Sequence, residues 1–197
     1  MNPKKPVFVV FEGLDGSGKT TSARKTTELL GATYVTTPTP ELRRFRDDII
    51  ASFHGNQEAA QLFYLATVFA ASHDIARMLA GGVSVVLDRY FVSTQAYAEF
   101  RGSKLALDHL GDELLRPDLT VYLDASLEVR RARVGARGEE SAADRETLRP
   151  DADATLRRLH LKRSTLGVVG KWLNVDTSAI EPGDVARRVV SAILIRG

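Results

Sequence analysis

The segment Gly13–Thr20 carries the strongest chemical signal in the sequence. It reads GLDGSGKT and fits the pattern GxxxxGK[ST]. Glycines let such a loop curl so that its N–H groups point at a phosphate, and the N-terminus of a following helix adds partial positive charge. Lys19 can then reach the β- and γ-phosphates, and the Thr20 hydroxyl can bind Mg²⁺. The segment therefore predicts a binding site for a nucleoside triphosphate with Mg²⁺.

Asp88 and Arg89 follow the apolar run Val83–Leu87 and form a second candidate site. An acid at the end of a buried strand beside a phosphate loop is the usual second partner of Mg²⁺, directly or through water. The alternative is a solvated acid that merely ends a strand. Arg89 beside it favours a site, because this cation is expected to face an anion.

Both candidates lie in a regular succession of short apolar runs and helical stretches. Four of the five runs are continuously apolar, as strands of a parallel sheet covered on both faces must be. The predicted strands are Val7–Phe11, Tyr34–Thr37, Val83–Leu87, Leu119–Leu123 and Trp172–Val175. The predicted helices are Lys19–Leu30, Glu58–Leu79, Ser126–Ala136, Asp151–Val169 and Asp184–Ile195. Of these, we expect Glu58–Leu79 to be largely buried, since it is apolar around most of its circumference.

This alternation predicts an α/β fold, a doubly wound five-stranded parallel sheet with helices on both faces and a small lid. Ligands then bind at the carboxyl ends of the strands, which is where Gly13–Thr20 and Asp88 lie. With 197 residues and no linker-like tract, the chain is expected to form one domain, 1–197.

Composition limits the class of protein. Hydrophobic residues make up 44% of the chain and charged residues 26%, which is ordinary for a globular protein. With no cysteine there are no disulfides and no thiolate metal sites, which fits a cytoplasmic location. No apolar run is long enough to span a membrane, so we expect no membrane contact. The net charge of +2 argues against nucleic-acid binding through a general basic field.

Among enzymes with a phosphate loop, a small kinase fits best. A GTPase would need a guanine-reading NKxD segment, which is missing from the sequence. A DxxG match, Asp108–Gly111, lies too far past the third strand to sense a γ-phosphate, and we interpret it as a helix surface.

The order of several segments resembles the thymidylate kinase family. Phe11–Thr21 is similar to the opening of these enzymes, and Asp88–Tyr90 followed by Ser93–Tyr97 resembles their DRY…STxAY segment. Arg116–Asp124 resembles their KPDLTxYLD strand, and the stretch from Arg133 through Arg137 to Arg145 resembles their lid. The resemblance implies transfer of the γ-phosphate of ATP to dTMP, with Mg²⁺, by a cytoplasmic enzyme that is usually a homodimer paired through helices.

The resemblance also implies roles for individual residues. ATP would be held by the phosphate loop and a lid arginine: Gly13, Asp15, Gly16, Ser17, Gly18, Lys19, Thr20, Thr21 and Arg133. Catalysis would fall to Lys19, Asp15, Asp88, Arg89, Arg137 and Arg145, with Thr20 and Asp88 at the metal. The acceptor would meet Asp15, Phe63, Thr67, Arg89, Gln95 and Tyr97, with Phe63 stacking on the base and Tyr97 crowding the sugar 2′ position. The loop Asp176–Ser178 would lie near the adenine.

The lid, at about 133–149, is expected to supply a cation for the γ-phosphoryl oxygens. Some thymidylate kinases carry that arginine inside the phosphate loop, but here the position is Gly16. Arg133, Arg137 and Arg145 are the candidates, in a segment with small residues that suits a flap. The alternative is a solvated charged helix.

Two departures from the family pattern concern the acceptor. Thr67 stands where the family usually has an arginine that reads the base, and Thr36–Arg44 breaks the REPGG-like or Pro-Glu-Arg segment. Arg43 or Arg44 could replace the arginine of that REPGG-like segment. The hypotheses left open are therefore dTMP, another pyrimidine monophosphate (dCMP, dUMP or a modified pyrimidine), a deoxynucleoside as acceptor with Asp88 or Glu12 as base, and a nucleotide-binding module with little kinase activity.

Overall fold

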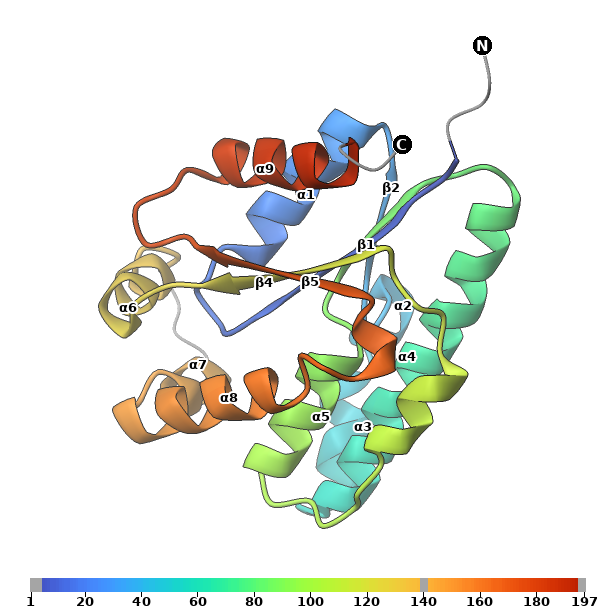
Figure 1. Ribbon diagram of the computed structural model, residues 1–197. Coiled ribbons are helices and arrows are strands. Elements are labelled where there is room, and N and C mark those ends of the chain that lie inside the picture. Colours follow the sequence, from blue (N-terminus) through green and yellow to red (C-terminus); the bar gives the residue numbers. More distant parts are fainter. Residues whose placement is uncertain (1–4, 139–141, 195–197) are drawn as a thin grey trace.

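The computed structural model describes residues 5–138 and 142–194 (Figure 1). Within them, five strands form one parallel sheet in the order β2-β3-β1-β4-β5, which confirms the predicted fold class. The strands are β1 (Phe8–Gly13), β2 (Thr33–Thr36), β3 (Val85–Asp88), β4 (Leu119–Asp124) and β5 (Lys171–Asp176). Each lies within two residues of its predicted position.

Helices connect the strands and cover the sheet. They are α1 (Lys19–Leu30), α2 (Pro40–Arg43), α3 (Arg46–Ser52), α4 (Gln57–Ala80), α5 (Phe91–Phe100), α6 (Leu127–Gly135), α7 (Ala142–Thr147), α8 (Pro150–Lys162) and α9 (Pro182–Leu194). Two 3₁₀ helices, η1 (Asp108–Glu113) and η2 (Gly167–Val169), complete the described chain, and the DxxG segment lies in η1. No helix of the described residues is long and apolar enough to cross a membrane.

The strands are apolar on both sides because helices pack against both faces of the sheet. In β1, Phe8 and Val10 join the core with α4 and α5, whereas Val9 and Phe11 join the core with α1 and α9. Figure 1 shows α1 and α9 above the sheet and α4, α5 and α8 below it. This two-sided burial removes the polar alternation that a half-exposed sheet would show.

Two expectations about helices differ from the structure, the end of one helix and the burial of α4. The predicted helix Asp151–Val169 is wrong at its end, because α8 stops at Lys162 and η2 follows separately. The C-cap residue Arg163 is buried and ion-paired with Glu99 and Asp108, and Ser164, Thr165 and Gly167 after it are poor helix formers. Sequence reasoning also missed α2, α3, α5 and α7.

Helix α4 is buried on one side only, although it is apolar around most of its circumference. Leu65, Val68 and Ile75 pack into the core, while Leu62 keeps 51% of its surface exposed. Leu62, Ala66 and Ala70 of α4 are exposed, so an apolar stripe of this helix faces outward.

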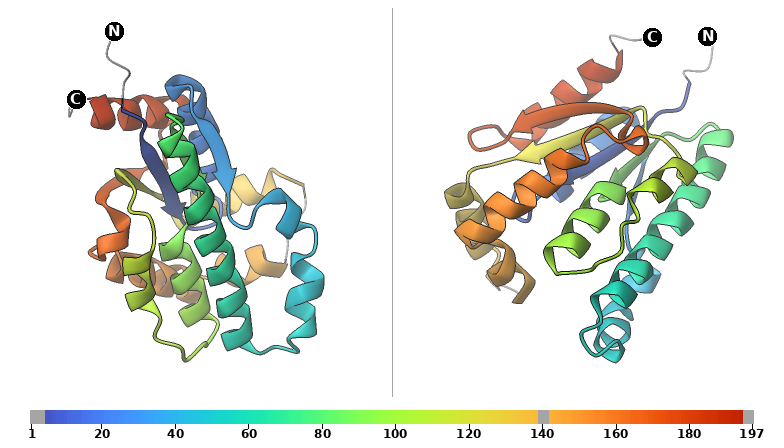
Figure 2. Two further views of the ribbon diagram at one scale, coloured as in Figure 1. Left: turned by 90° about the vertical axis from the view of Figure 1, so that its right-hand side faces the viewer. Right: turned by 60° about the horizontal axis from the view of Figure 1, so that its bottom comes forward.

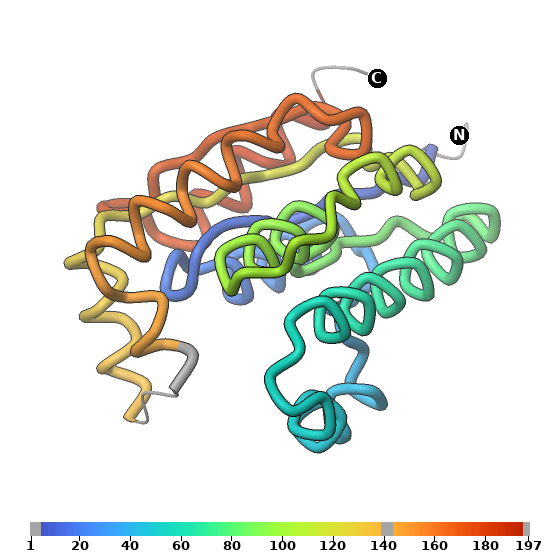
Figure 3. Tube along the Cα trace, turned by 90° about the horizontal axis from the view of Figure 1, so that it is seen from below, coloured from blue at the N-terminus to red at the C-terminus, as the bar shows by residue number. Residues whose placement is uncertain are grey.

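The register of the sheet brings chemically active residues to one edge. Phe11 pairs with Asp88, Thr36 pairs with Asp88, and Asp124 pairs with Asp176, so the strands end side by side. Figures 2 and 3 show that the segment α2–α3 and the segment α6–α7 project from the same side of the molecule. Strands β3 and β4 lie on opposite sides of β1, so the strand order reverses at β1. In a doubly wound sheet, a ligand usually binds at the carboxyl ends of the strands beside such a reversal.

Candidate active site

The phosphate loop joins β1 to α1, and its glycines are required by the backbone. Gly13 has φ +138°, and a Cβ atom there would lie 2.3 Å from the Leu123 carbonyl oxygen. Gly18 caps α1 in the left-handed region with φ +89°. The Lys19 ammonium folds back and donates to the Leu14 carbonyl oxygen at 2.6 Å. Burial lowers the pKa of Lys19 to about 7, and the neighbouring Arg89 acts in the same direction.

Thr20 and Asp88 meet beside this loop, as the metal-site expectation requires. The Thr20 hydroxyl donates to Asp88 Oδ2 at 2.6 Å, and the Tyr34 hydroxyl donates to the same oxygen at 3.0 Å. Asp88 Oδ1 is buried without a hydrogen-bond partner among the described residues. A hydroxyl and a carboxylate with a vacant lone pair are oxygen ligands that suit Mg²⁺. The residues present therefore fit this ion.

Asp15 is the centre of a second cluster on the other side of the loop. One carboxylate oxygen forms an ion pair with Arg89, and the other accepts from the Tyr97 hydroxyl at 2.8 Å and from Thr147 at 3.3 Å. Burial raises the pKa of Asp15, but the Arg89 and Lys19 cations outweigh burial and hold it below its usual range. Asp15 is therefore a carboxylate at neutral pH, with Arg89 and Tyr97 aligned on it.

Arg89 is held in an unusual conformation. Its φ of +69° lies in the left-handed region, which costs a residue other than glycine on the order of 1 kcal/mol or more. Its guanidinium lies 5.2 Å from the centre of the Tyr97 ring, and its Nη1 donates to Ser93 at 3.4 Å. The strained backbone turns this cation from the end of β3 toward the phosphate loop.

Glu12 anchors the turn that carries Arg89. It is fully buried and accepts from the backbone N–H groups of Tyr90 at 3.1 Å and Ser93 at 3.2 Å, and from the Ser93 hydroxyl. Both its oxygens are therefore engaged in fixing the start of α5. Burial raises the pKa of Glu12, against the hydrogen bonds from Ser93.

The residues expected to contact the acceptor base lie on α4 and α5. Phe63 is half-buried, with edge contacts to Phe53 at 6.4 Å and to Tyr64 at 5.3 Å between ring centres. Thr67 is buried, and its hydroxyl donates to the Tyr64 carbonyl oxygen of its own helix at 2.7 Å. Its polar atom is thus already used within α4.

Gln95 is part of a buried amide cluster. Its side-chain oxygen accepts from Gln61 at 2.6 Å, while its Nε2 has no hydrogen-bond partner within the described chain. Gln61 in turn accepts from Ser103. This arrangement joins α4 to α5 and leaves one buried amide donor available.

The structure distinguishes Arg43 from Arg44. Arg43 donates to the Thr36 hydroxyl at 2.8 Å, at the end of β2 next to β3. Arg44 instead lies over the Phe45 ring at 4.6 Å. Arg43 is therefore the arginine of this segment that reaches the sheet edge.

A hollow beside the phosphate loop collects the expected nucleotide-binding residues. Ser17, Gly18, Thr21, Arg133, Arg137 and Thr177 line it, together with residues at the start of α9. Arg133 donates to the Thr177 carbonyl oxygen at 2.6 Å, and Thr177 donates to the Ser17 carbonyl oxygen at 2.9 Å. The loop after β5 is thereby tied to the phosphate loop.

The predicted lid segment, about 133–149, begins in the last turns of α6, includes α7 and ends just before α8. Arg133 lies on α6, Arg137 follows it, and Arg145 lies on α7. Residues 139–141 of the predicted lid lie outside the described residues. Thr147, at the end of α7, reaches Asp15 and links this segment to the phosphate loop.

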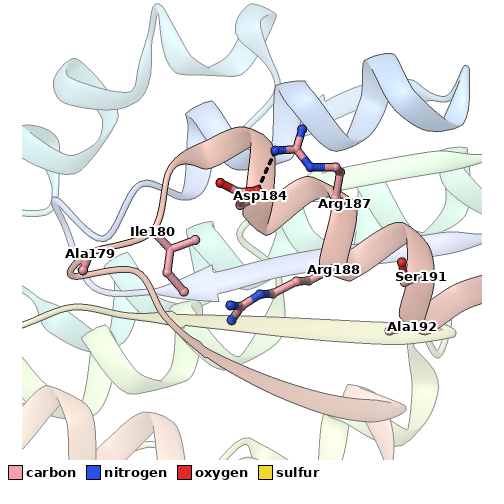
Figure 4. A pocket seen from close by; sticks show the side chains of 7 residues that line it. All are labelled: Ala179, Ile180, Asp184, Arg187, Arg188, Ser191 and Ala192. Atoms are coloured by element: carbon pink, nitrogen blue, oxygen red, sulfur yellow. Dashed lines mark hydrogen bonds and ion pairs between the residues drawn. The ribbon is translucent and has the colours of Figure 1, made fainter.

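A second hollow lies along α9 and shares Ile180 with the hollow beside the phosphate loop. Figure 4 shows Arg187 paired with Asp184 at 2.5 Å and Arg188 extending along the same hollow toward Ile180. These side chains are at the surface, and none of them contacts the phosphate loop in any of the described interactions. We assign this hollow no part in the site.

Sequence reasoning missed several residues that contact the site. Tyr34 bonds Asp88, Thr147 bonds Asp15, and Arg130 bonds the Asp15 carbonyl oxygen. Arg130 precedes Arg133 by three positions, so one helix face carries both, and this spacing was the available signal. Tyr34 and Thr147 had no such local signal.

Comparisons with known proteins agree on one family. Residues 11–166 match the family model for thymidylate kinase. A thymidylate kinase of Leptospira interrogans is 34% identical over 152 residues, covering 71% of this chain and 74% of that protein. A probable thymidylate kinase of Archaeoglobus fulgidus is 34% identical over 142 residues, covering 68% of this chain and 72% of its own length.

Solved structures show the same fold. The thymidylate kinase of Candida albicans superposes with a TM-score of 0.75 at 21% identity, over 97% of this chain and 92% of that one. The thymidylate kinase of Ehrlichia chaffeensis gives a TM-score of 0.65 at 22% identity, over 95% and 98% of the two chains.

Proposed function

Because this chain belongs to the thymidylate kinase family, we propose that it transfers the γ-phosphoryl group of ATP to dTMP at the site described above. A phosphate oxygen of dTMP attacks the γ-phosphorus, the bond to the β–γ bridging oxygen breaks, and dTDP and ADP leave. The observation that carries the proposal is the meeting of Asp15, Arg89 and Tyr97 next to Lys19. Arg89, a cation that can bind the acceptor phosphate, and two polar side chains that can face its sugar thus lie beside the loop that binds the triphosphate.

On the donor side, the backbone N–H groups of the phosphate loop hold the triphosphate, and Lys19 leaves the Leu14 carbonyl to bind phosphate oxygens. The adenine occupies the hollow between Arg133 and the Thr177 loop. Arg133 already bridges these two walls, so little reorganisation is needed.

Thr20 and Asp88 would hold Mg²⁺, with Tyr34 orienting the carboxylate. When bound, this ion neutralises charge on the β- and γ-phosphates. The vacant lone pair on buried Asp88 Oδ1 supports this assignment. Asp88 keeps its place through the adjacent strands β1 and β2.

On the acceptor side, Arg89 binds the dTMP phosphate, and Arg43 reaches the same edge from α2. Tyr97, fixed on Asp15, lies against the sugar and disfavours a 2′-hydroxyl. Phe63 stacks on the base, which any flat pyrimidine permits. Gln95 has a buried Nε2 donor that is unpaired within the described chain, and this donor can hydrogen-bond a carbonyl oxygen of the base.

In the lid segment, Arg137 and Arg145 supply positive charge for the transferring phosphoryl group. Gly16 itself offers no side chain, and its φ of +79° places the loop where a Cβ would collide with Arg130. An arginine therefore has no room at this position, and a cation that joins Lys19 at the γ-phosphoryl group comes from outside the phosphate loop.

A phosphorylated acceptor fits this site better than a nucleoside. A nucleoside would need a free carboxylate to take the 5′-hydroxyl proton, but both oxygens of Glu12 are engaged by Ser93 and Tyr90. Asp88 accepts from Thr20 and Tyr34 through one oxygen, and its other oxygen is the one proposed above to bind Mg²⁺. Arg89, in contrast, adds a cation that a nucleoside would not use.

We also propose a cytoplasmic homodimer, with α4 at the contact between copies. Leu62 is 51% exposed, and Ala66 and Ala70 continue the same apolar stripe one and two turns along the helix. A second copy of the same stripe would cover it. Sedimentation of the wild type and of Leu62→Lys tests this: a dimer that the substitution splits supports it, and a monomeric wild type contradicts it.

The experiment that tests the function is a coupled ADP assay with ATP, Mg²⁺ and each nucleoside and deoxynucleoside monophosphate, with thymidine as a further acceptor. We expect turnover with dTMP, none with thymidine, and loss of turnover in Lys19→Ala without loss of fold. Arg133→Ala, Arg137→Ala and Arg145→Ala are each expected to lower kcat. Wild-type kcat in all three would reject the proposed role of the lid segment.

A further inference from the structure

Arg130 on α6 has an unusual position for an arginine. Its side chain is only 1% exposed, and it is the largest of the fully buried side chains. It lies against the Asp15–Gly16 turn of the phosphate loop and not in the nucleotide hollow. We propose that Arg130 is a positioning residue that fixes this turn for phosphoryl transfer, an inference that rests on the function proposed above.

The contact between Arg130 and the loop involves both side chain and main chain. Arg130 Nε donates to the Asp15 carbonyl oxygen at 2.6 Å. A Cβ atom on Gly16 would lie 2.7 Å from the Arg130 carbonyl oxygen and 3.0 Å from its Cα atom. Helix α6 is therefore packed directly on the turn, and the absence of a side chain at Gly16 is what permits this approach.

The other end of the guanidinium is anchored to α8 and to β4. Arg130 Nη1 forms an ion pair with Asp153, whose second oxygen accepts from Arg157 Nε at 2.9 Å. Arg157 is paired in turn with Asp124 at the end of β4. Positive and negative charges alternate along Arg130, Asp153, Arg157 and Asp124. These ion pairs fix one end of the guanidinium while Arg130 Nε bonds the loop.

Thermodynamics gives a reason to assign Arg130 a task beyond stability. A buried ion pair is generally no more stabilising than apolar side chains of similar size, because both charges lose their hydration. Arg130 Nη2 is moreover buried without a hydrogen-bond partner among the described residues, which adds a cost of its own. Two apolar side chains would fill this place at a lower cost in free energy, but they could not donate a hydrogen bond to the Asp15 carbonyl oxygen.

Fixing Asp15 affects both substrates. Its carbonyl oxygen is held by Arg130, while its carboxylate holds Arg89 and Tyr97 on the acceptor side. The next residues supply the N–H groups that face the triphosphate. A shift of about 1 Å in a catalytic constellation can reduce the rate on the order of a hundredfold. Arg130 thus keeps the residues that bind ATP and the residues that bind dTMP correctly placed relative to each other.

The test compares Arg130→Met, Arg130→Lys and the double variant Arg130→Met/Asp153→Leu, which removes the buried charges together. Arg163→Met is the matched control, since Arg163 is also buried and paired with two acids but contacts no residue of the phosphate loop. For each protein we measure the melting temperature, the affinity for a non-hydrolysable ATP analogue by calorimetry, and kcat and KM for dTMP.

We expect the double variant to melt within a few degrees of the wild type, to bind the analogue at least about tenfold more weakly, and to lose kcat by about ten- to a hundredfold. Arg130→Lys should recover part of the loss, and Arg163→Met should melt lower but keep its analogue affinity. Affinity and kcat within twofold of the wild type in the double variant would overturn the proposal. An equal loss of analogue affinity in Arg163→Met would also overturn it, because the losses would then follow the melting temperature and not the contact with the loop. The analogue readout stands even if dTMP proves not to be the acceptor.

Discussion

The hydroxyl of Thr20 donates a 2.6 Å hydrogen bond to the carboxylate of Asp88, across 68 positions of sequence. One residue opens α1 and the other closes β3, and the parallel pairing of β1 with β3 brings them together. The remaining Asp88 oxygen is buried and, within the described chain, unpaired. This relationship defines the proposed metal site.

Asp88→Asn is therefore expected to raise the Mg²⁺ concentration needed for half-maximal activity and to lower kcat on the order of a hundredfold, because a neutral amide binds Mg²⁺ poorly. Tyr34→Phe, which removes only one hydrogen bond to Asp88, should have a much smaller effect. The measurement is kcat as a function of Mg²⁺ at saturating ATP. An unchanged Mg²⁺ dependence in Asp88→Asn would place the ion elsewhere.

Lys19 gives a pH dependence to nucleotide binding. Burial lowers its pKa from 10.5 to about 7 in the free protein, so the ammonium loses its proton as the pH rises above neutrality. A bound triphosphate favours the charged form, and binding above pH 7 must then take up a proton. We expect the affinity for an ATP analogue to fall between about pH 7 and 9.

Calorimetry in two buffers with different ionisation enthalpies measures this proton uptake directly. Lys19→Met removes the titrating group and should bind the analogue weakly, with no uptake of this kind. Equal proton uptake in the wild type and in Lys19→Met would show that another group titrates.

Thr67 is expected not to read the acceptor base through its hydroxyl, because that hydroxyl is bonded to the Tyr64 carbonyl of its own helix. Thr67→Val should therefore leave the ratio of kcat/KM for dTMP and dCMP within about twofold. Thr67→Arg, with a longer donor, should raise the preference for dTMP if the guanidinium reaches the base. A preference for dTMP that collapses in Thr67→Val would assign the hydroxyl a direct role.

His160 predicts an acid-sensitive fold. It is fully buried, and burial lowers its pKa from 6.5 to about 3. Below about pH 6.5 the unfolded chain binds a proton at His160 that the folded chain does not take up until about pH 3. The free energy of unfolding must therefore decrease as the pH falls through this window, with a slope approaching about 1.4 kcal/mol per pH unit for this one group.

Urea unfolding between about pH 5 and 6.5 measures this slope where ordinary carboxylates are already ionised, and comparison with a variant assigns the contribution of His160. His160→Phe should flatten the slope there, whereas His73→Gln, at a side chain that is 76% exposed, should leave it unchanged. A slope that is identical in His160→Phe and the wild type would contradict the prediction.

The sequence by itself determined the phosphate loop and the positions of the strands. Gly13–Thr20 is contiguous, and its glycine spacing, the preceding apolar run and the following helix are all local features. Continuously apolar runs indicated a sheet covered on both faces, and the shared edge of parallel strands then placed Asp88 near Thr20. These inferences needed only periodicity and the geometry of parallel sheets.

Only the tertiary structure decided the contacts that join distant segments. Tyr34 meets Asp88 across 54 positions, and Arg130 meets Asp15 across 115. Strand order places β2 beside β3, and the packing of α6 on Gly16 selects Arg130 from the twenty-seven lysines and arginines of the chain. Local sequence patterns record which face of an element is apolar, but not which other element will cover it. Long-range pairings follow from how the elements pack, because each such contact forms only when the whole sheet and its covering helices are in place.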